Sequence, residues 1–325
     1  MNILVTGGAG YIGSIVTETC IDRGDEVTVY DNLSTGHRQA VHPDARFITG
    51  DVGDGEKLEI ALRDGRTDAV IHMAGFIEAG ESMLDPGKYF RNNACRPVEL
   101  LEAMRRADVG RILFSSTAAI YGDPLTDFID EDHPQNPANA YGESKLLFER
   151  LLDWYDLIFG IKHAALRYFN AAGATDERGE DHKPETHLIP LVLNTALGNR
   201  EYVEIFGSDY PTDDGTCIRD YIHIRDLARA HLMAIDKLDN ESLHYNLGNG
   251  RGYSVMEVIG TARKITEVDF EVRDASRRVG DPVVLVSSSK RISKELGWSP
   301  EYPSLDDIIR SAWDWHREHP EGYSL

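Results

Sequence analysis

The residues with the clearest capacity for chemistry are Tyr141 and Lys145, which stand four positions apart at the start of a leucine-containing helical pattern. This spacing places both side chains on one face of a helix. A phenol with a solution pKa of about 10 is a poor base at neutral pH, but an ammonium about 4 Å away attracts the phenolate by roughly 4 kcal/mol at an effective dielectric of about 20, or about three pKa units. Burial opposes part of this effect. The pair predicts a general acid/base at Tyr141 with Lys145 as its electrostatic partner, and an ordinary surface pair is the alternative.

Hydroxyl groups stand upstream of this pair, where the β-branched and apolar run Arg111–Ser116 is followed by Thr117. A strand that ends there supplies a hydroxyl beside the tyrosine. We expect Thr117 to hydrogen-bond the oxygen that reacts.

A second chemical signal is the glycine pattern Gly7, Gly10 and Gly13, which follows the first apolar run and opens a helical pattern. Gly7 permits a tight turn, Gly10 lets the backbone approach a pyrophosphate, and Gly13 allows the helix to pack closely on the strand. The helix N-terminus offers N–H groups and a partial positive charge to phosphates. Chance gives such a pattern about 0.2 times in a chain of this composition, so its place at a strand-to-helix junction is what predicts a dinucleotide site.

Asp31 ends the second apolar run, where a carboxylate can accept hydrogen bonds from the adenosine ribose and would repel a 2′-phosphate. The residue favours NAD over NADP, and an ordinary turn aspartate is the alternative.

The elements that must position these residues alternate between short apolar runs and helical patterns. Such strands, apolar on both faces and separated by helices, form a parallel sheet covered on both sides, so the sequence predicts a doubly wound α/β fold of the Rossmann type with a smaller mixed α/β lobe toward the C-terminus. We expect an NAD-binding domain over residues 1–167, to which residues 222–247 return, and a second lobe over 168–325 whose long polar loops build a substrate site, which the family resemblance below implies is a nucleotide-sugar site. The predicted strands are Ile3–Thr6, Glu26–Tyr30, Arg46–Thr49, Ala69–Met73, Arg111–Ser116 and His244–Leu247, and the predicted helices include Ile12–Arg23 and Pro97–Arg106.

The composition excludes several classes of protein. A net charge of −21 argues against partners bound through phosphate backbones or anionic lipid, so we expect no nucleic-acid and no membrane partner. No apolar run is long enough to span a bilayer, and three scattered cysteines form no disulfide framework, so a soluble cytoplasmic protein is expected. The histidines show no metal-binding spacing, which predicts no metal, and His316 and His319 are expected to be solvated on a polar C-terminal helix.

With these motifs in place, the chain resembles the extended short-chain dehydrogenases/reductases, and among them the UDP-glucose 4-epimerases. The likeness runs essentially from end to end. Its most specific part is the block from Ile205 to His223, which generic reductases lack. The other parts are Thr6–Gly13, Asp31–Leu33, Gly50–Val52, His72–Gly75 with Gly80–Ser82, Ser115–Thr117 with Tyr121–Gly122, Tyr141–Lys145 and Arg167–Asn170.

The resemblance implies an NAD site and a UDP-sugar site. Asp51 and Val52 would flank the adenine, and Asn92, Tyr168 and Phe169 would line the nicotinamide side. The other residues implied near the cofactor, besides Tyr141 and Lys145, are Gly7, Gly10, Tyr11, Ile12, Gly13, Asp31, Asn32, Met73, Ala74, Gly75 and Ser115. The residues implied at the UDP-sugar are Thr117, Asn170, His187, Leu188, Phe206, Arg219, Val255, Arg278 and Asp281.

Two positions depart from the pattern of that family. Ile77 stands where many members carry a lysine near the cofactor, although another subset also lacks it. Leu285 stands at the position that gates N-acetylated substrates, so tolerance for UDP-N-acetylglucosamine is open.

The activity implied is interconversion of UDP-galactose and UDP-glucose through a 4-keto sugar, with transient hydride transfer to tightly bound NAD, in a homodimer that pairs the 97–106 and 141–155 helices. The alternatives are another nucleotide-sugar epimerase acting on UDP-N-acetylglucosamine or UDP-glucuronate, a 4,6-dehydratase, or a non-catalytic dinucleotide sensor. Ala118 and Ala119 disfavour the dehydratase, which needs an Asp-Glu pair there, and the intact Tyr141 and Lys145 disfavour the sensor.

Overall fold

The computed structural model describes residues 1–239, 241–278 and 282–323, and its chain divides into two compact units. Unit 1 comprises Met1–Gly122, Pro134–Tyr168 and Ala228–Tyr245, and unit 2 comprises Asp123–His133, Phe169–Leu227 and Asn246–Leu325. From the sequence we expected the first domain to end at residue 167 and the chain to return to it over residues 222–247. We did not expect Asp123–His133 to belong to the second unit.

Unit 1 is built on a seven-stranded sheet in the order β10-β6-β5-β4-β1-β2-β3. The six strands from β3 to β6 pair in parallel, and the order reverses between β1 and β4, which is where doubly wound folds bind ligands at the carboxyl ends of their strands. The expected fold class is confirmed. The strands are β1 (Asn2–Thr6), β2 (Glu26–Asp31), β3 (Arg46–Thr49), β4 (Ala69–His72), β5 (Arg111–Thr117), β6 (Lys162–Tyr168) and β10 (Leu243–Leu247).

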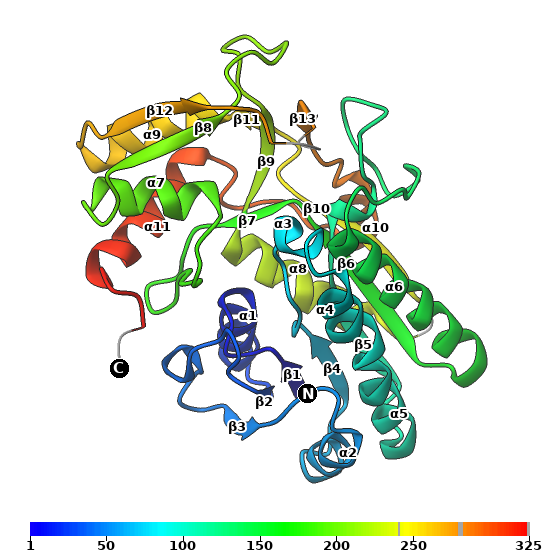
Figure 1. Cartoon of the computed structure of the whole chain (residues 1–325). Helices are drawn as coiled ribbons and strands as arrows, with labels where there is room; N and C mark the ends of the chain where they lie inside the picture. The colour runs from blue at the N-terminus through cyan, green and yellow to red at the C-terminus, as the bar shows by residue number, and fades with distance from the viewer. Residues whose placement is uncertain (240, 279–281, 324–325) are drawn as a thin grey trace. The chain divides into compact units, whose positions relative to one another are not determined.

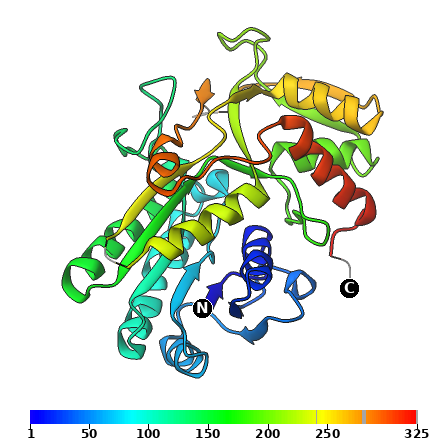
Figure 2. The same cartoon turned by 180° about the vertical axis from the view of Figure 1, so that it is seen from behind.

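Helices cover both faces of this sheet. On one face α2 (Gly55–Asp64), α5 (Pro97–Ala107) and α6 (Ala140–Phe159) lie side by side (Figure 1), and their buried apolar faces share one core with the strands, including Leu58, Leu100 and Phe148. On the other face lie α1 (Tyr11–Asp22) and α8 (Ile224–Lys237), as Figure 2 shows from behind. The shorter elements are η1 (Arg38–Ala40), α3 (Ala79–Ser82), α4 (Pro86–Phe90), η2 (Arg91–Cys95) and η3 (Ala118–Ile120).

Unit 2 combines small sheets with three helices that pack on one another. In its larger sheet β9 (Ile218–His223) pairs with β7 (Asn170–Ala172), β11 (Gly252–Ser254) and β13 (Val284–Leu285), and β8 (Tyr202–Phe206) pairs with β12 (Glu271–Ala275). The helices α7 (Leu188–Ala196), α9 (Val255–Thr266) and α11 (Leu305–Glu318) share its core, and α10 (Lys290–Leu296) follows β13.

One expectation about the last helix is wrong. His316 is buried, with 6% of its surface exposed, because α11 turns that side inward together with Trp315. Among the described residues, no helix is long and apolar enough to cross a membrane.

Candidate active site

The glycine turn after β1 is closed tightly enough to exclude side chains. Gly7 has a φ of 74°, and a Cβ there would lie 2.5 Å from the backbone N of Ala74. A Cβ on Gly13 would lie 2.2 Å from the carbonyl oxygen of Gly7, so the first turn of α1 packs directly on the loop. Gly10 is the N-cap of α1 and has no side chain to accept from the first N–H groups of the helix, and no acidic residue lies in that turn. The residues present therefore fit a dinucleotide pyrophosphate.

The carboxylate of Asp31 is fixed at the end of β2 beside this turn. It accepts hydrogen bonds from the backbone N of Ala9 at 3.0 Å and of Leu33 at 2.7 Å. Burial raises the pKa of the carboxyl, and the two hydrogen bonds oppose that shift. Asn32 donates to Asp51 at 3.0 Å, so two residues expected on the adenosine side lie together.

Thr117 and Tyr141 meet at the carboxyl end of β5. Thr117 ends the strand, caps η3 by accepting from the backbone N of Ala119 at 3.1 Å, and shares a side-chain hydrogen bond with Tyr141. Burial raises the pKa of the Tyr141 phenol, the Thr117 hydrogen bond lowers it, and the charge of Glu78 raises it. The two hydroxyl groups therefore lie together, and burial is the largest influence on the pKa of the phenol.

Lys145 follows Tyr141 on α6 and is buried, with 3% of its surface exposed. Its Nζ donates to the carbonyl oxygen of Ser115 at 2.9 Å and lies 4.9 Å from the ring centre of Phe114. The same Nζ lies 3.1 Å from where a Cβ on Gly75 would be. Burial lowers the pKa of Lys145 to about 8, and the charge of Glu149 opposes that shift. The ammonium is thus anchored on β5 by a lysine that lies on the same helix as Tyr141, four residues after it.

A polar network that the sequence did not reveal holds the start of α6. The backbone N of Tyr141 donates to Ser82 Oγ at 3.0 Å, and Ser144 Oγ donates to the carbonyl oxygen of Tyr141 at 2.7 Å. Asn93, which is 1% exposed, donates to Ser144 Oγ at 3.1 Å and accepts from the backbone N of Phe76 at 2.9 Å. Apart from the Ser144–Tyr141 bond, which spans 3 residues, these partners lie 17 to 59 residues apart in sequence, so no local pattern could have identified them.

The remaining residues expected at the nicotinamide side are partly brought together. Tyr168 hydrogen-bonds Ser115 and His231, and its hydroxyl lies 3.9 Å from the sulfur of Met73. Asn92 donates to Asn93 Oδ1 at 3.1 Å. Phe169 is the first residue of its segment of unit 2, and His231 is a further residue that the sequence did not single out.

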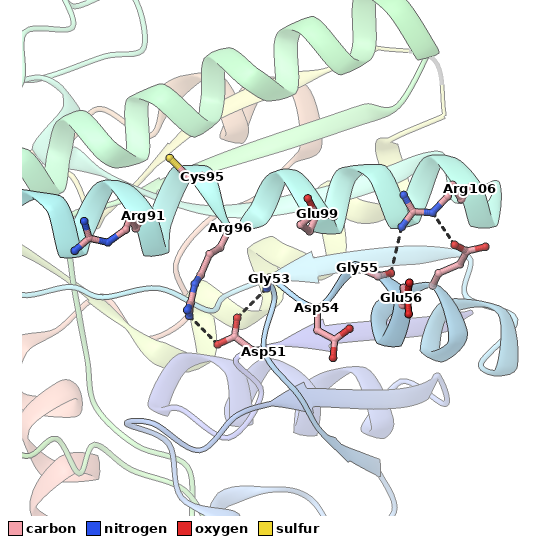
Figure 3. A pocket seen from close by; sticks show the side chains of 11 residues that line it. Asp51, Gly53, Asp54, Gly55, Glu56, Arg91, Cys95, Arg96, Glu99 and Arg106 are labelled. Carbon is pink, nitrogen blue, oxygen red and sulfur yellow. Dashed lines mark hydrogen bonds and ion pairs between the residues drawn. The ribbon is translucent and has the colours of Figure 1, made fainter.

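A surface groove of about 1180 Å³ lies apart from this chemistry, along α2, η2 and α5 (Figure 3). Of its lining residues only Asp51 belongs to the expected cofactor site. Asp51 is paired there with Arg96 at 2.9 Å, and Arg106 pairs with Glu59 at 2.6 Å. None of Thr117, Tyr141 and Lys145 lines the groove, so it is not the reaction site.

The residues expected at the UDP-sugar lie in unit 2, except for Thr117. Asn170 donates to the carbonyl oxygen of Asp220 at 2.7 Å, and Arg219 donates to that of Pro282 at 2.9 Å, which places both beside β9. The guanidinium of Arg278 lies 4.0 Å from the ring centre of Phe206. Leu285 pairs with Arg219 in the β13–β9 register.

Three more of these expected residues start helices of unit 2. His187 is the N-cap of α7, Leu188 is its first residue, and Val255 is the first residue of α9. Leu188 and Val255 pack against the same core, and Asp281 lies outside the described residues.

Residues 3–248 match the model of the NAD dependent epimerase/dehydratase family. The chain belongs to this family. It is 47% identical to the UDP-glucose 4-epimerase of Lacticaseibacillus casei, with 99% of each chain covered. Among solved structures it is similar to the UDP-glucose 4-epimerase of Brucella ovis in complex with NAD, at 44% identity and a TM-score of 0.93 over 96% of this chain and 97% of that one. It is also similar to the UDP-glucose 4-epimerase of Bifidobacterium longum in complex with NAD+ and UDP, at 36% identity and a TM-score of 0.94 over 99% and 100%.

Proposed function

We propose that this chain interconverts UDP-galactose and UDP-glucose, with Tyr141 as the general acid/base. The observation that carries the proposal is the Thr117–Tyr141–Lys145 arrangement at the carboxyl end of β5, in a chain that matches UDP-glucose 4-epimerases over nearly its full length.

NAD fits the glycine turn and Asp31, and when bound it supplies an acceptor for the hydride of the sugar C4 and returns that hydride later. Gly7, Gly10 and Gly13 admit the pyrophosphate, and the Asp31 carboxylate favours a ribose without a 2′-phosphate. A Cβ at Gly75 would crowd Lys145 Nζ, so the glycine keeps the backbone close to the ammonium.

In the forward direction the Tyr141 oxygen takes the proton of the sugar's 4-hydroxyl, and the hydrogen bond from Thr117 holds the reacting oxygen in place. Lys145 lies four residues along the same helix, and its positive charge would stabilise the phenolate while the Ser115 carbonyl oxygen holds the ammonium in place. After the 4-keto sugar turns over, Tyr141 returns the proton and the inverted 4-hydroxyl forms.

The UDP moiety must stay anchored while the sugar turns, and an acidic protein needs focused positive charge to hold a diphosphate. Arg219 and Arg278 are the candidates, since a planar guanidinium matches phosphate oxygens. Arg278 is pre-positioned by stacking on Phe206. Asn170, His187, Leu188 and Val255 would complete the anchor.

A 4,6-dehydratase activity is disfavoured because no acidic residue follows Thr117. Elimination of water requires a proton donor just after the threonine, and Ala118 and Ala119 occupy η3 there. Neither side chain carries a carboxyl group.

The experiment is to incubate purified protein with UDP-galactose, without added reductant, and to follow UDP-glucose by NMR. Tyr141→Phe should lower kcat by orders of magnitude while UDP-sugar affinity stays nearly intact, because only the proton transfer is lost. Tyr155→Phe is the matched control, since this tyrosine lies on the same helix but bonds Glu102. Retained kcat in Tyr141→Phe would contradict the role of that residue, and a wild-type chain without conversion would contradict the proposed activity. UDP-N-acetylgalactosamine, run in parallel, tests the gate at Leu285.

We further propose a homodimer formed through α5 and α6. The outer side of α6 exposes a contiguous apolar face, with Trp154, Leu157 and Ile158 exposed by 59%, 75% and 61%. Such a face is typical of a protein interface. In light scattering, Ile158→Glu should convert dimer to monomer, whereas Leu125→Glu, at a 74% exposed position that belongs to neither α5 nor α6, should not. Dimers that persist in Ile158→Glu would exclude this face.

The cytoplasmic location also stays a proposal, supported by three cysteines that form no disulfide.

A further inference from the structure

A second cluster of chemically capable side chains lies in unit 2, in the loop that joins β7 to α7 (Figure 1). Its members, which we call the His–Glu cluster, are Glu180, His182, Glu185 and His187. Glu180 is buried, the side chains of His182 and Glu185 are partly exposed, and that of His187 is 42% exposed, so the cluster reaches from the interior of unit 2 to its surface. The spacing Glu-x-His-x-x-Glu-x-His matches none of the familiar metal motifs, which is why the sequence predicted no metal.

The four side chains converge on one point. One oxygen of Glu180 lies 3.2 Å from His182 Nδ1 and 3.0 Å from His187 Nδ1. The carboxylate of Glu185 lies 2.8 Å from His187 Nδ1 and 4.0 Å from His182 Nδ1. All four candidate ligand atoms lie within 4.8 Å of one another.

These separations are those of a tetrahedral metal site. Zinc binds histidine nitrogen and carboxylate oxygen at about 2.0–2.2 Å, and a regular tetrahedron of that size has edges of about 3.3–3.5 Å. The printed separations of 2.8 to 4.0 Å straddle that edge. Because all four ligand atoms lie within 4.8 Å of one another, an ion at the centre would need ligand shifts of at most about 1 Å.

We propose that the His–Glu cluster binds one structural zinc ion. Two imidazole nitrogens favour zinc over magnesium or calcium, and four protein ligands leave no open position for a catalytic water. Two carboxylates balance the charge of the ion, and the acidic chain raises the local concentration of cations. The inference does not rest on the proposed acid/base chemistry, but it shares His187 with the proposed UDP anchor. Nδ1 of His187 would bind the ion, which leaves only its Nε2 for the UDP contact.

The role of the ion follows from what the loop touches. Asp181 accepts from the backbone N of Tyr323 at 2.9 Å, and the Tyr323 hydroxyl accepts from the backbone N of Gly179 at 3.1 Å, so the loop holds the segment that follows α11. At its other end the loop reaches His187, the N-cap of α7. The ion would cross-link this loop and fix the start of α7.

The test is to load the purified protein with zinc, remove the excess by gel filtration and count the metal by mass spectrometry. We expect one zinc per chain, released by a strong chelator, and a melting temperature about 4 °C higher when zinc is at roughly a hundredfold excess over its Kd. Cobalt(II) in place of zinc should give the intense visible absorption of a tetrahedral site. A zinc-free wild-type chain after loading, or an octahedral cobalt spectrum, would overturn the proposal.

Substitutions of candidate ligands test whether the His–Glu cluster holds the ion. His182→Gln should weaken zinc binding at least about 100-fold, and His182→Cys, which keeps a zinc ligand, should restore it. Asp153→Asn is the matched control, because Asp153, His163 and His244 form a second group of possible ligands elsewhere in the chain. Zinc retained in His182→Gln, or lost in Asp153→Asn, would show that the His–Glu cluster is not the site.

Discussion

The contact between α6 and η3 makes Gly142 the most informative position to perturb. A Cβ on Gly142 would lie 2.4 Å from the carbonyl oxygen of Ala119 and 2.9 Å from its carbonyl carbon. Both partners are backbone atoms, so no side chain can move aside. Since unstrained contacts with carbon need about 3.5 Å, Gly142→Ala must push the start of α6 away from η3 by roughly 1 Å.

That displacement acts on the neighbouring Tyr141, which must stay aligned with Thr117. A misplacement of about 1 Å at a reacting group can lower the rate about 100-fold, which corresponds to roughly 2.7 kcal/mol of activation free energy. Forcing a methyl group into a packed contact also costs about 1–3 kcal/mol of stability. We therefore expect kcat to fall about 100-fold, with a smaller change in KM, because the residues expected to hold UDP lie in unit 2.

The assay is the conversion of UDP-galactose to UDP-glucose by wild type, Gly142→Ala and Gly260→Ala, with thermal unfolding measured on each. Gly260 lies within α9, where a Cβ would meet no atom within 4 Å, so its variant should keep wild-type kcat and gain about 0.5–1 kcal/mol in stability. Wild-type kcat and unchanged stability in Gly142→Ala would refute the reasoning, because the helix would then have yielded without moving the tyrosine.

Three other substitutions test the glycine turn, the buried Lys145 and the ion pair between Glu149 and Arg167. Gly13→Ala should give protein purified without bound dinucleotide, because its Cβ would lie 2.2 Å from the Gly7 carbonyl oxygen; chromatography of the released nucleotide measures this. Burial lowers the pKa of Lys145 from 10.5 to about 8. Between pH 8 and 10.5 the unfolded chain therefore binds more protons than the folded chain, and the free energy of unfolding rises with pH. The total rise is about 3 kcal/mol. In denaturant titrations, Lys145→Met should remove that rise. Glu149→Gln should lower the free energy of unfolding by about 3–5 kcal/mol, because it leaves the buried Arg167 without a counter-charge.

Each of these expectations has an outcome that contradicts it. A Gly13→Ala chain that still carries a full complement of dinucleotide would show that the turn tolerates a methyl group. An identical alkaline rise in Lys145→Met and wild type would assign the rise to another group. A loss below about 1 kcal/mol in Glu149→Gln would mean that solvent reaches the Arg167 guanidinium.

Much of the sheet could be predicted because each strand carries its own signal. Runs such as Ile3–Thr6 and Arg46–Thr49 are short, apolar and rich in β-branched residues, and both form strands at nearly the expected bounds. His316 was misjudged for the opposite reason. The residues that follow it, Arg317 and Glu318, are charged, and its burial depends on packing within unit 2 that this local pattern does not report.

The candidate active site likewise has some features that a local sequence pattern predicts and others that it does not. The Tyr141–Lys145 pair and the glycine turn are local, since a helix or a turn fixes their geometry within a few residues. The bond from Tyr141 N to Ser82 Oγ spans 59 residues, and the bond from Asn93 to Ser144 spans 51, so these supports arise from the fold alone.

The buried ion pair between Arg167 and Glu149 joins the stability of unit 1 to its chemistry. Burial strengthens the field of the Lys145 ammonium on its surroundings, but the same burial lowers the pKa of Lys145 to about 8, close to the pH at which the charge is needed. Glu149 lies four residues along the same helix, and its charge raises the pKa of Lys145 against that effect. Arg167 holds this carboxylate in place, with bonds of 3.1 and 2.7 Å to its two oxygens. The ion pair between Arg167 and Glu149 therefore also favours the charged form of Lys145, which is the form that the proposed acid/base role of Tyr141 requires.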